Sequence, residues 1–124
     1  MIHKHAALTA LVTLVILGAG CSTRDVSFKQ DVYPILSENC LSCHKPGTEG
    51  YIKSGLSMEN YAAVMKGTKF GPVIVAGSHI SSTLILLLER KAHTSINMPK
   101  DHPPLADSQV EVIRKWIDQG AKNN

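Results

Sequence analysis

The sequence predicts an all-α fold of four to five short helices joined by long loops. Apolar residues recur at spacings of three and four in several segments, which is the period of a helix. The segments between them are rich in Gly and Pro, and no stretch alternates convincingly between apolar and polar residues. With 124 residues, 44% hydrophobic and 19% charged, the chain has the size and composition of one globular domain.

The first twenty residues have the pattern of an export signal. A short positive start precedes an apolar run over residues 6–17, and small residues then lead to Cys21. The run is short for a spanning helix, which needs about 20 residues. The pattern resembles a bacterial lipoprotein signal, and this resemblance implies that Cys21 is acylated and holds the protein on a membrane. A plain secretion signal and an uncleaved anchor are the alternatives.

Three segments follow from this division of the chain. Residues 1–20 are the predicted signal peptide, residues 21–27 a polar leader or tether, and residues 28–124 the working domain. We expect an exported protein on the periplasmic side of a bacterial membrane, held there through its N-terminal lipid. The formal charge of +3 is too small to indicate nucleic-acid binding, which requires a clustered basic face.

The first helix of the domain is predicted over Phe28–Asn39, where apolar residues fall on one side. Pro34 lies inside this run and should bend the helix or mark its true start. A loop rich in Gly and Pro is expected over Lys45–Gly55. The next helix is predicted over Met58–Lys66, with Ser57 as its N-cap and Gly67 as its stop.

Two further helices are expected in the C-terminal half. A loop over residues 68–78 leads to a helix that starts at Ser81 or Ser82 and runs to about Lys91. Residues 93–104 read as irregular because they contain three prolines. The last helix is predicted from Asp107 or Ser108 to about Gln119.

The motif that carries chemistry is Cys40-Leu41-Ser42-Cys43-His44, the C-x-x-C-H pattern of covalent haem c attachment. Side chains three apart on a helical turn are neighbours, about 5–6 Å between Cβ atoms. Cys40 and Cys43 can therefore add to the two vinyl groups along one haem edge. His44 then faces the iron as the proximal ligand.

Three other interpretations of the motif stay open at this point. Cys40 and Cys43 could form a disulfide, although such a small loop gains little from closure. A thioredoxin-like redox pair would need a βαβ context, which the sequence lacks. A zinc site could combine the two cysteines with His93 and His102, whose spacing of nine is wide for paired histidine ligands.

Met98 is the leading candidate for the second axial iron ligand. It lies in an irregular segment followed by Pro99, where a thioether is poorly explained as core filler. His93 and His102 flank it and are its rivals. Met58 and Met65 lie seven apart on the second predicted helix, which is the spacing of core residues. A methionine ligand raises the reduction potential relative to a second histidine, and it favours electron transfer over substrate binding.

These residues together resemble the planctomycete-type branch of class I c-type cytochromes. The matching positions are Phe28, Asp31-Val32, Pro34-Ile35-Leu36, Cys40, Cys43-His44, Gly55-Leu56, Tyr61, Gly67, Gly71 to Val75, Gly77, Ser82-Thr83-Leu84, Met98-Pro99, Leu105 and Ile113 to Ala121. The resemblance implies a small cytochrome c fold around one covalent haem, with Met98 as distal ligand. It also implies single-electron transfer as the activity.

The resemblance suggests two supporting residues. A carbonyl in a Gly-Pro loop holds the proximal imidazole N–H in class I cytochromes, which makes Pro72 a candidate partner of His44. Trp116 is a candidate to pack on the haem or to bond a propionate through its indole N–H, and a core aromatic at the helix crossing is the alternative.

The sequence therefore predicts a monohaem electron carrier, not an enzyme, that passes electrons between a donor and an acceptor redox protein. The alternatives are a peroxidase-like or gas-sensing haem domain, which would need an open distal site, and a haem-bearing subunit of a larger redox complex.

Overall fold

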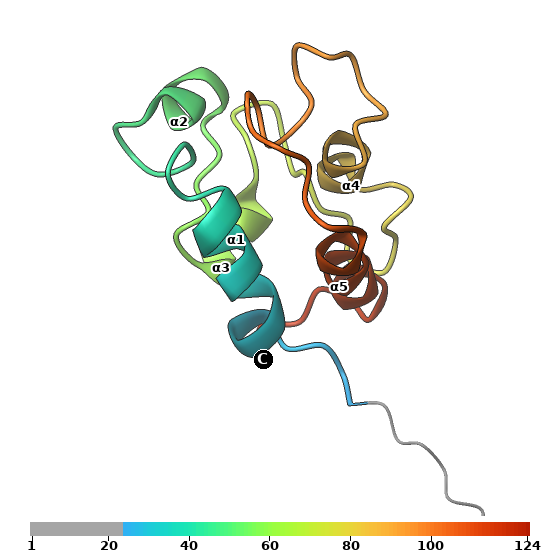
Figure 1. Cartoon of the computed structure of the whole chain (residues 1–124). Helices are drawn as coiled ribbons and strands as arrows, with labels where there is room; N and C mark the ends of the chain where they lie inside the picture. The colour runs from blue at the N-terminus through green and yellow to red at the C-terminus, as the bar shows by residue number, and fades with distance from the viewer. Residues whose placement is uncertain (1–23) are drawn as a thin grey trace, which may run out of the picture.

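The computed structural model describes residues 24–124, so the predicted export signal and Cys21 lie outside the described residues. Within residues 24–124 the chain is helical and forms no sheet, which confirms the predicted all-α class (Figure 1). No helix in this range has the length and apolar character needed to cross a bilayer. The elements are η1 (Phe28–Val32), α1 (Tyr33–Asn39), α2 (Glu49–Ser54), α3 (Tyr61–Lys66), α4 (Thr83–Leu88) and α5 (Asp107–Asp118).

The first predicted helix is present and consists of η1 followed directly by α1. Pro34 is the second residue of α1 and has no N–H to bond to a carbonyl of the preceding turn in η1. The Ser27 side chain accepts a hydrogen bond from the Gln30 amide at 3.1 Å. The Ser27 amide in turn donates to the Asp31 carboxylate at 2.7 Å. These bonds fix where the helix begins.

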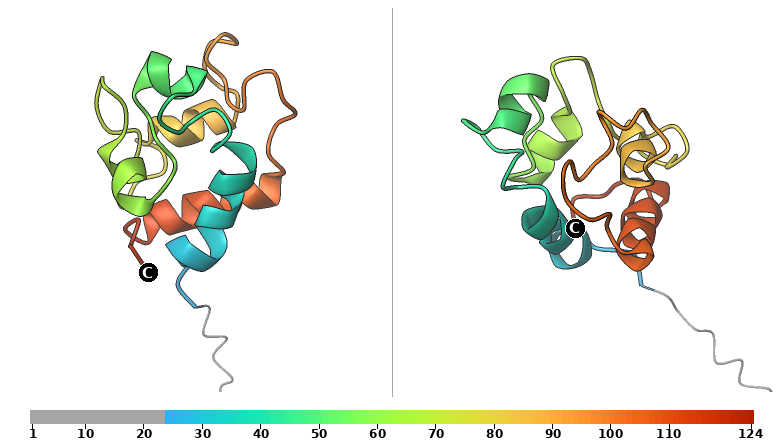
Figure 2. Two further views of the ribbon diagram at one scale, coloured as in Figure 1. Left: turned by 90° about the vertical axis from the view of Figure 1, so that its left-hand side faces the viewer. Right: turned by 45° about the horizontal axis from the view of Figure 1, so that its top comes forward.

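The core forms where η1, which continues into α1, packs against α5, and α4 also packs against α5 (Figures 1 and 2). Trp116 is 1% exposed and lies 5.4 Å, centroid to centroid, from Phe28. Tyr61 meets Phe28 edge-on at 5.2 Å. The Tyr33 ring also lies 5.9 Å from Phe28, so four of the six aromatic residues gather at this helix crossing. The remaining core is aliphatic and comes mainly from Val, Ile and Leu.

Three predicted element boundaries were wrong. The predicted loop over residues 45–55 contains α2, because its glycines and Pro46 suggest turns while Gly55, at φ +76°, only ends the helix. Helix α3 begins at Tyr61 and not at Met58, because the Asn60 side chain caps it by accepting from the Ala63 amide. Helix α4 ends at Leu88, before the predicted Lys91.

Asn124 forms hydrogen bonds with residues 26–29, a set of contacts that we call the clasp. Its side-chain oxygen accepts from the Phe28 amide at 2.9 Å, and its backbone oxygen accepts from the Lys29 amide at 3.0 Å and the Ser27 hydroxyl at 2.7 Å. Its side-chain amide donates to the Val26 carbonyl at 3.2 Å. These bonds serve N–H groups at the start of η1 that have no partner within the helix.

Within the leader predicted over residues 21–27, the described residues from Arg24 onward make contacts with the domain. The Arg24 guanidinium pairs with Asp31 through two bonds of 2.7 Å. The Val26 amide donates to Gln119 Oε1 at 2.7 Å. These polar groups contact Asp31 in η1 and Gln119 at the end of α5.

Asp31 predicts an acid-sensitive contribution to stability. The hydrogen bonds from Arg24 and from the Ser27 amide lower the pKa of Asp31 to about 2. Its pKa in the unfolded chain is about 3.9, so this contribution is present above a pH of about 4 and is lost as the pH falls toward about 2. Urea unfolding of Asp31→Asn should therefore show a smaller loss of unfolding free energy across that pH range than wild type. An equal loss would contradict this role.

Candidate haem-attachment site

The C-x-x-C-H motif forms a tight turn at the end of α1. The Cys40 amide donates to the Leu36 carbonyl at 2.9 Å, which completes the helix. The Cys40 carbonyl then accepts from the amides of Cys43, at 3.1 Å, and His44, at 2.9 Å. Both thiols and the imidazole therefore come from one turn, as the spacing predicted. Cys40 is buried among the core residues, and Cys43 is exposed.

The far side of the turn is fixed by α2 and the segment after it. The Cys43 carbonyl accepts from the Thr48 hydroxyl at 2.6 Å and from the Tyr51 amide at 3.1 Å. The Met58 amide donates to the His44 carbonyl at 2.8 Å. The sequence analysis did not identify these contacts, because Thr48 and Tyr51 have no pattern that links them to the motif.

Gly50 is required by the close approach of α2 to the motif. A Cβ atom at this position would lie 2.4 Å from the Cys43 carbonyl oxygen and 3.1 Å from Cε1 of His44. The first neighbour is backbone, and the second belongs to the buried His44 ring. Gly50 therefore allows α2 to seal the imidazole from one side, a role hidden among the other glycines of the segment.

His44 is 8% exposed, and its Nδ1 is the one buried side-chain nitrogen or oxygen among residues 24–124 without a hydrogen-bond partner. Burial lowers the pKa of His44, while the backbone of Leu56 acts in the opposite direction. A neutral imidazole is the form that binds a metal. A hydrogen bond to the second ring nitrogen commonly orients metal-bound histidines, and Nδ1 of His44 has no such bond here.

Both cysteines of the motif are free thiols in the structure, so the disulfide alternative is not formed. Burial, with a smaller effect of Cys43, raises the pKa of the Cys40 thiol to about 11. The zinc alternative also finds no support, because no three His, Cys, Asp or Glu side chains between residues 24 and 124 gather as metal ligands would. His93 and His102 are thus not brought to the cysteines.

Met98 and its two histidine rivals differ in burial. Met98 is half-buried and packs against the core, and its amide donates to the Leu87 carbonyl at 3.2 Å. His93 and His102 are both exposed. The Nδ1 atom of His93 is also engaged locally, 2.8 Å from the Ser95 hydroxyl. Of the three candidates, Met98 is the one whose side chain lies against the interior.

The pKa of Glu49, the first residue of α2, is affected by two lysines. Hydrogen bonding to Lys53 is the main cause that lowers the pKa of Glu49, and the charge of Lys100 contributes as well. Lys100 follows Met98 by two residues, and Glu49 precedes Gly50.

The structure places the two suggested supporting residues, Pro72 and Trp116, differently. Pro72 is exposed, and the bond expected from its carbonyl to His44 Nδ1 is not formed. The indole N–H of Trp116 donates to the Lys122 carbonyl at 2.8 Å. Trp116 thus takes the position of a core aromatic at the helix crossing, and its N–H is already used. Contacts of either residue with a haem stay predictions.

The donor set fits covalent haem c. The site offers two free thiols three residues apart, a buried imidazole with an unsatisfied Nδ1 and a half-buried thioether on a neighbouring segment. When bound, haem c supplies an iron that gains and loses one electron. Cys40 and Cys43 would hold the porphyrin, His44 would ligate the iron, and Met98 is the candidate for its other side.

A fold and a site of this kind define a haem c protein. Residues 40–102, just over half of the chain, match the family described as Planctomycete cytochrome C. The chain belongs to this family, and the family implies covalently bound haem c and a haem-based redox role. Cytochrome c domains are usually exported proteins. No curated protein and no solved structure matches the chain.

Proposed function

We propose that this protein is a monohaem electron carrier in which His44 and Met98 ligate the iron. It accepts one electron from a donor protein and passes it to an acceptor protein, and it transfers no atoms. The protein contributes ligation, burial and a docking surface. The burial of Met98 against the core, with both rival histidines exposed, is the observation that carries this proposal.

Burial of the site residues suits electron transfer. His44 is held by backbone bonds on both sides of the motif, and Met98 is anchored through its amide to α4. Ligands fixed in this way move little between two oxidation states, which keeps the energy of reorganisation small. A closed iron also disfavours the gas-sensing and peroxidase-like alternatives, because these need a free coordination position.

The test is a potentiometric titration of the purified, haem-loaded protein followed by its absorbance. We expect one reversible one-electron transition, the same in both directions, and no spectral change when carbon monoxide meets the reduced protein. A reduced protein that binds carbon monoxide readily would favour the gas-binding alternative instead. Several transitions of unequal potential would contradict a single haem.

We also propose that the protein is exported and anchored by a lipid on Cys21. The support is the sequence pattern of residues 1–21 together with a haem c family whose members are usually exported. Growth with a radiolabelled or alkyne fatty acid should label wild type, and Cys21→Ser should lose both the label and sedimentation with membranes. Label retained by Cys21→Ser would contradict acylation at this residue.

A further inference from the structure

The described chain ends at one pole of the molecule, and the haem-attachment motif begins nearer the other. In Figure 1 and in the left view of Figure 2, residue 24 and the C-terminus lie at the end opposite α2. The five residues of η1 and the seven of α1 lead from the first pole to Cys40. At about 1.5 Å per residue, they separate Phe28 from the motif by roughly 18 Å.

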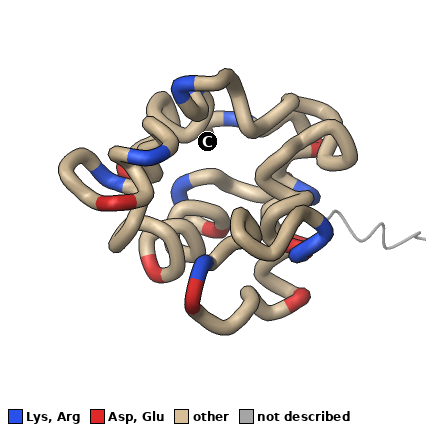
Figure 3. The backbone as a smooth tube through the Cα atoms, turned by 90° about the horizontal axis from the view of Figure 1, so that it is seen from above, with Lys and Arg blue, Asp and Glu red and all other residues tan. Residues whose placement is uncertain are grey.

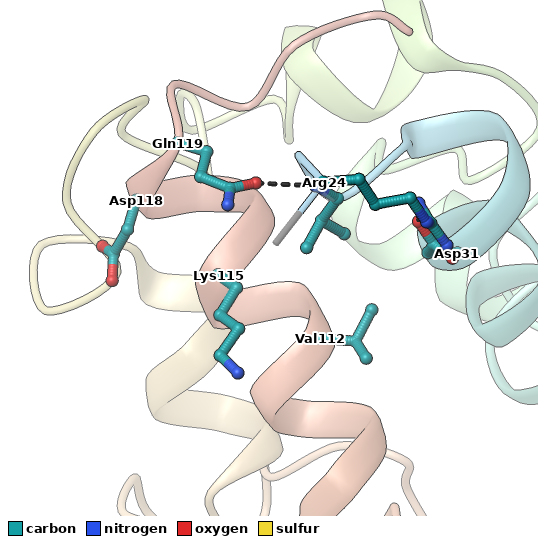
Figure 4. A pocket seen from close by; sticks show the side chains of 7 residues that line it. Arg24, Asp31, Val112, Lys115, Asp118 and Gln119 are labelled. Atoms are coloured by element: carbon teal, nitrogen blue, oxygen red, sulfur yellow. Dashed lines mark hydrogen bonds and ion pairs between the residues drawn. The ribbon is translucent and has the colours of Figure 1, made fainter. Parts of the chain in front are cut away.

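The N-terminal pole is fixed to the last helix (Figure 4). The bond from Val26 to Gln119 is drawn there, and Arg24 and Lys115 line a cleft at the same place. Asn124 accepts hydrogen bonds from the amides of Phe28 and Lys29, which follow in the chain. The chain is therefore part of the folded domain from Arg24 onward.

A lipid on Cys21 would leave only Ser22 and Thr23 between the anchor and Arg24, the first residue that the folded domain holds. Three Cα-to-Cα steps reach about 10 Å when fully extended. A domain of about 100 residues has a radius of gyration near 13 Å. The connection is thus shorter than the radius of the domain, so the domain cannot turn its far pole to the bilayer.

We propose that this short connection and the clasp of the chain ends hold the pole with Cys43 and His44 away from the membrane, so that the redox partner is a water-soluble protein. The inference rests on the proposed lipid anchor at Cys21. A carrier dissolved in the bilayer would meet the opposite pole, which bears Arg24 and Lys115.

The surface beside the motif fits a protein partner. The Lys69 amide donates to the Ser54 carbonyl at 2.9 Å, which places the turn over residues 68–71 against the end of α2. Phe70 and Ile52 are exposed there, at 84% and 69%. The Lys69 ammonium lies 5.2 Å from the Phe70 ring centroid.

These residues form an apolar centre beside positive charge, which suits a partner surface with an apolar centre and an acidic rim. Figure 3 shows basic and acidic positions spread around the molecule in the view from above. Charge alone therefore does not distinguish this surface from the rest of the molecule.

Lysine footprinting tests the orientation without using the redox activity. Lys115 lines the same cleft as Arg24, and Lys53 lies on α2. Their side chains are similarly exposed, at 62% for Lys115 and 66% for Lys53. The full-length haem-loaded protein is placed in phosphatidylethanolamine–phosphatidylglycerol vesicles, acylated with a lysine reagent, and compared with protein released by detergent. We expect vesicles to lower labelling of Lys115 severalfold and to leave Lys53 unchanged. Equal labelling ratios, or protection of Lys53, would overturn the proposal.

A variant with twelve Gly and Ser residues inserted between Thr23 and Arg24 is the matched control. Its longer connection should restore labelling of Lys115 in vesicles. It should also speed reduction by a long-chain quinol dissolved in the bilayer at least tenfold relative to wild type, while reduction by a short-chain soluble quinol stays the same. Wild type that is reduced from the bilayer as fast as this variant would overturn the inference.

Flotation with the vesicles distinguishes a failure of the proposed lipid anchor from a failure of the proposed orientation. Protein that does not float with the vesicles, and behaves like Cys21→Ser, would overturn both the anchor and the orientation. Protein that floats with the vesicles but shows equal labelling of Lys115 and Lys53 would overturn the orientation alone.

Discussion

Replacement of Met98 by Ala should lower the reduction potential of the haem-loaded protein by on the order of 0.1 V or more, within the range of about 0.8 V that axial ligands span. A thioether is a soft ligand that favours reduced iron, so its loss favours the oxidised form. The position left open should also admit carbon monoxide to the reduced protein. Potentiometric titration and a carbon monoxide difference spectrum measure both effects.

Met65→Ala is the matched control for this substitution. Met65 is half-buried and packs against the same core as Met98, but it lies on α3. It should lose packing without a change of potential or of carbon monoxide binding. A Met98→Ala protein with the potential and spectrum of wild type would show that Met98 is not a ligand. His93→Ala and His102→Ala would then identify which rival takes its place.

Replacement of Gly50 by Ala should destabilise the haem-loaded protein. At an ordinary exposed position inside a helix, by contrast, a change from Gly to Ala stabilises a protein by roughly 0.5–1 kcal/mol. The new Cβ would lie 2.4 Å from the Cys43 carbonyl oxygen, which is inside van der Waals contact. Overpacking of this kind costs typically about 1–3 kcal/mol. We expect a net loss near 1–2 kcal/mol, or a melting temperature lower by roughly 4–16 °C for a domain of this size.

The Gly50→Ala substitution should also disturb the iron, because the new methyl group would lie 3.1 Å from Cε1 of His44. Thermal unfolding measures the stability, and the absorbance of the oxidised and reduced protein measures the ligation. Glu49→Ala is the control, since this exposed neighbour on α2 already has a Cβ and loses only a surface ion pair. A Gly50→Ala protein as stable as wild type would contradict the sealing of His44 by α2.

The fold class and the motif could be predicted from the sequence because both are local patterns. Helical spacing identified the first and last helices, and C-x-x-C-H fixes its own turn geometry. Helix α2 was missed because its flanking glycines suggest loop, and Gly50 has a spatial role that no local pattern reports. The clasp by Asn124 joins residues almost a hundred positions apart, so only the folded chain reveals it.

The side-chain environments of the candidate residues depend on the fold and could not be predicted from the sequence. Met98, His93 and His102 are all plausible ligands by residue type, and their burial distinguishes them. Trp116 was expected either at the haem or at the helix crossing. The structure gives its N–H a backbone partner, a contact that depends on how residues 120–124 fold back.

The most direct test of the account is the mass of the intact protein after expression with a haem c maturation system. We predict a gain of one haem over the mass of the processed chain, retained after extraction with acidified acetone. Cys40→Ala with Cys43→Ala should abolish this gain. A wild-type chain without the added mass, or haem that the solvent removes, would contradict covalent attachment at this motif.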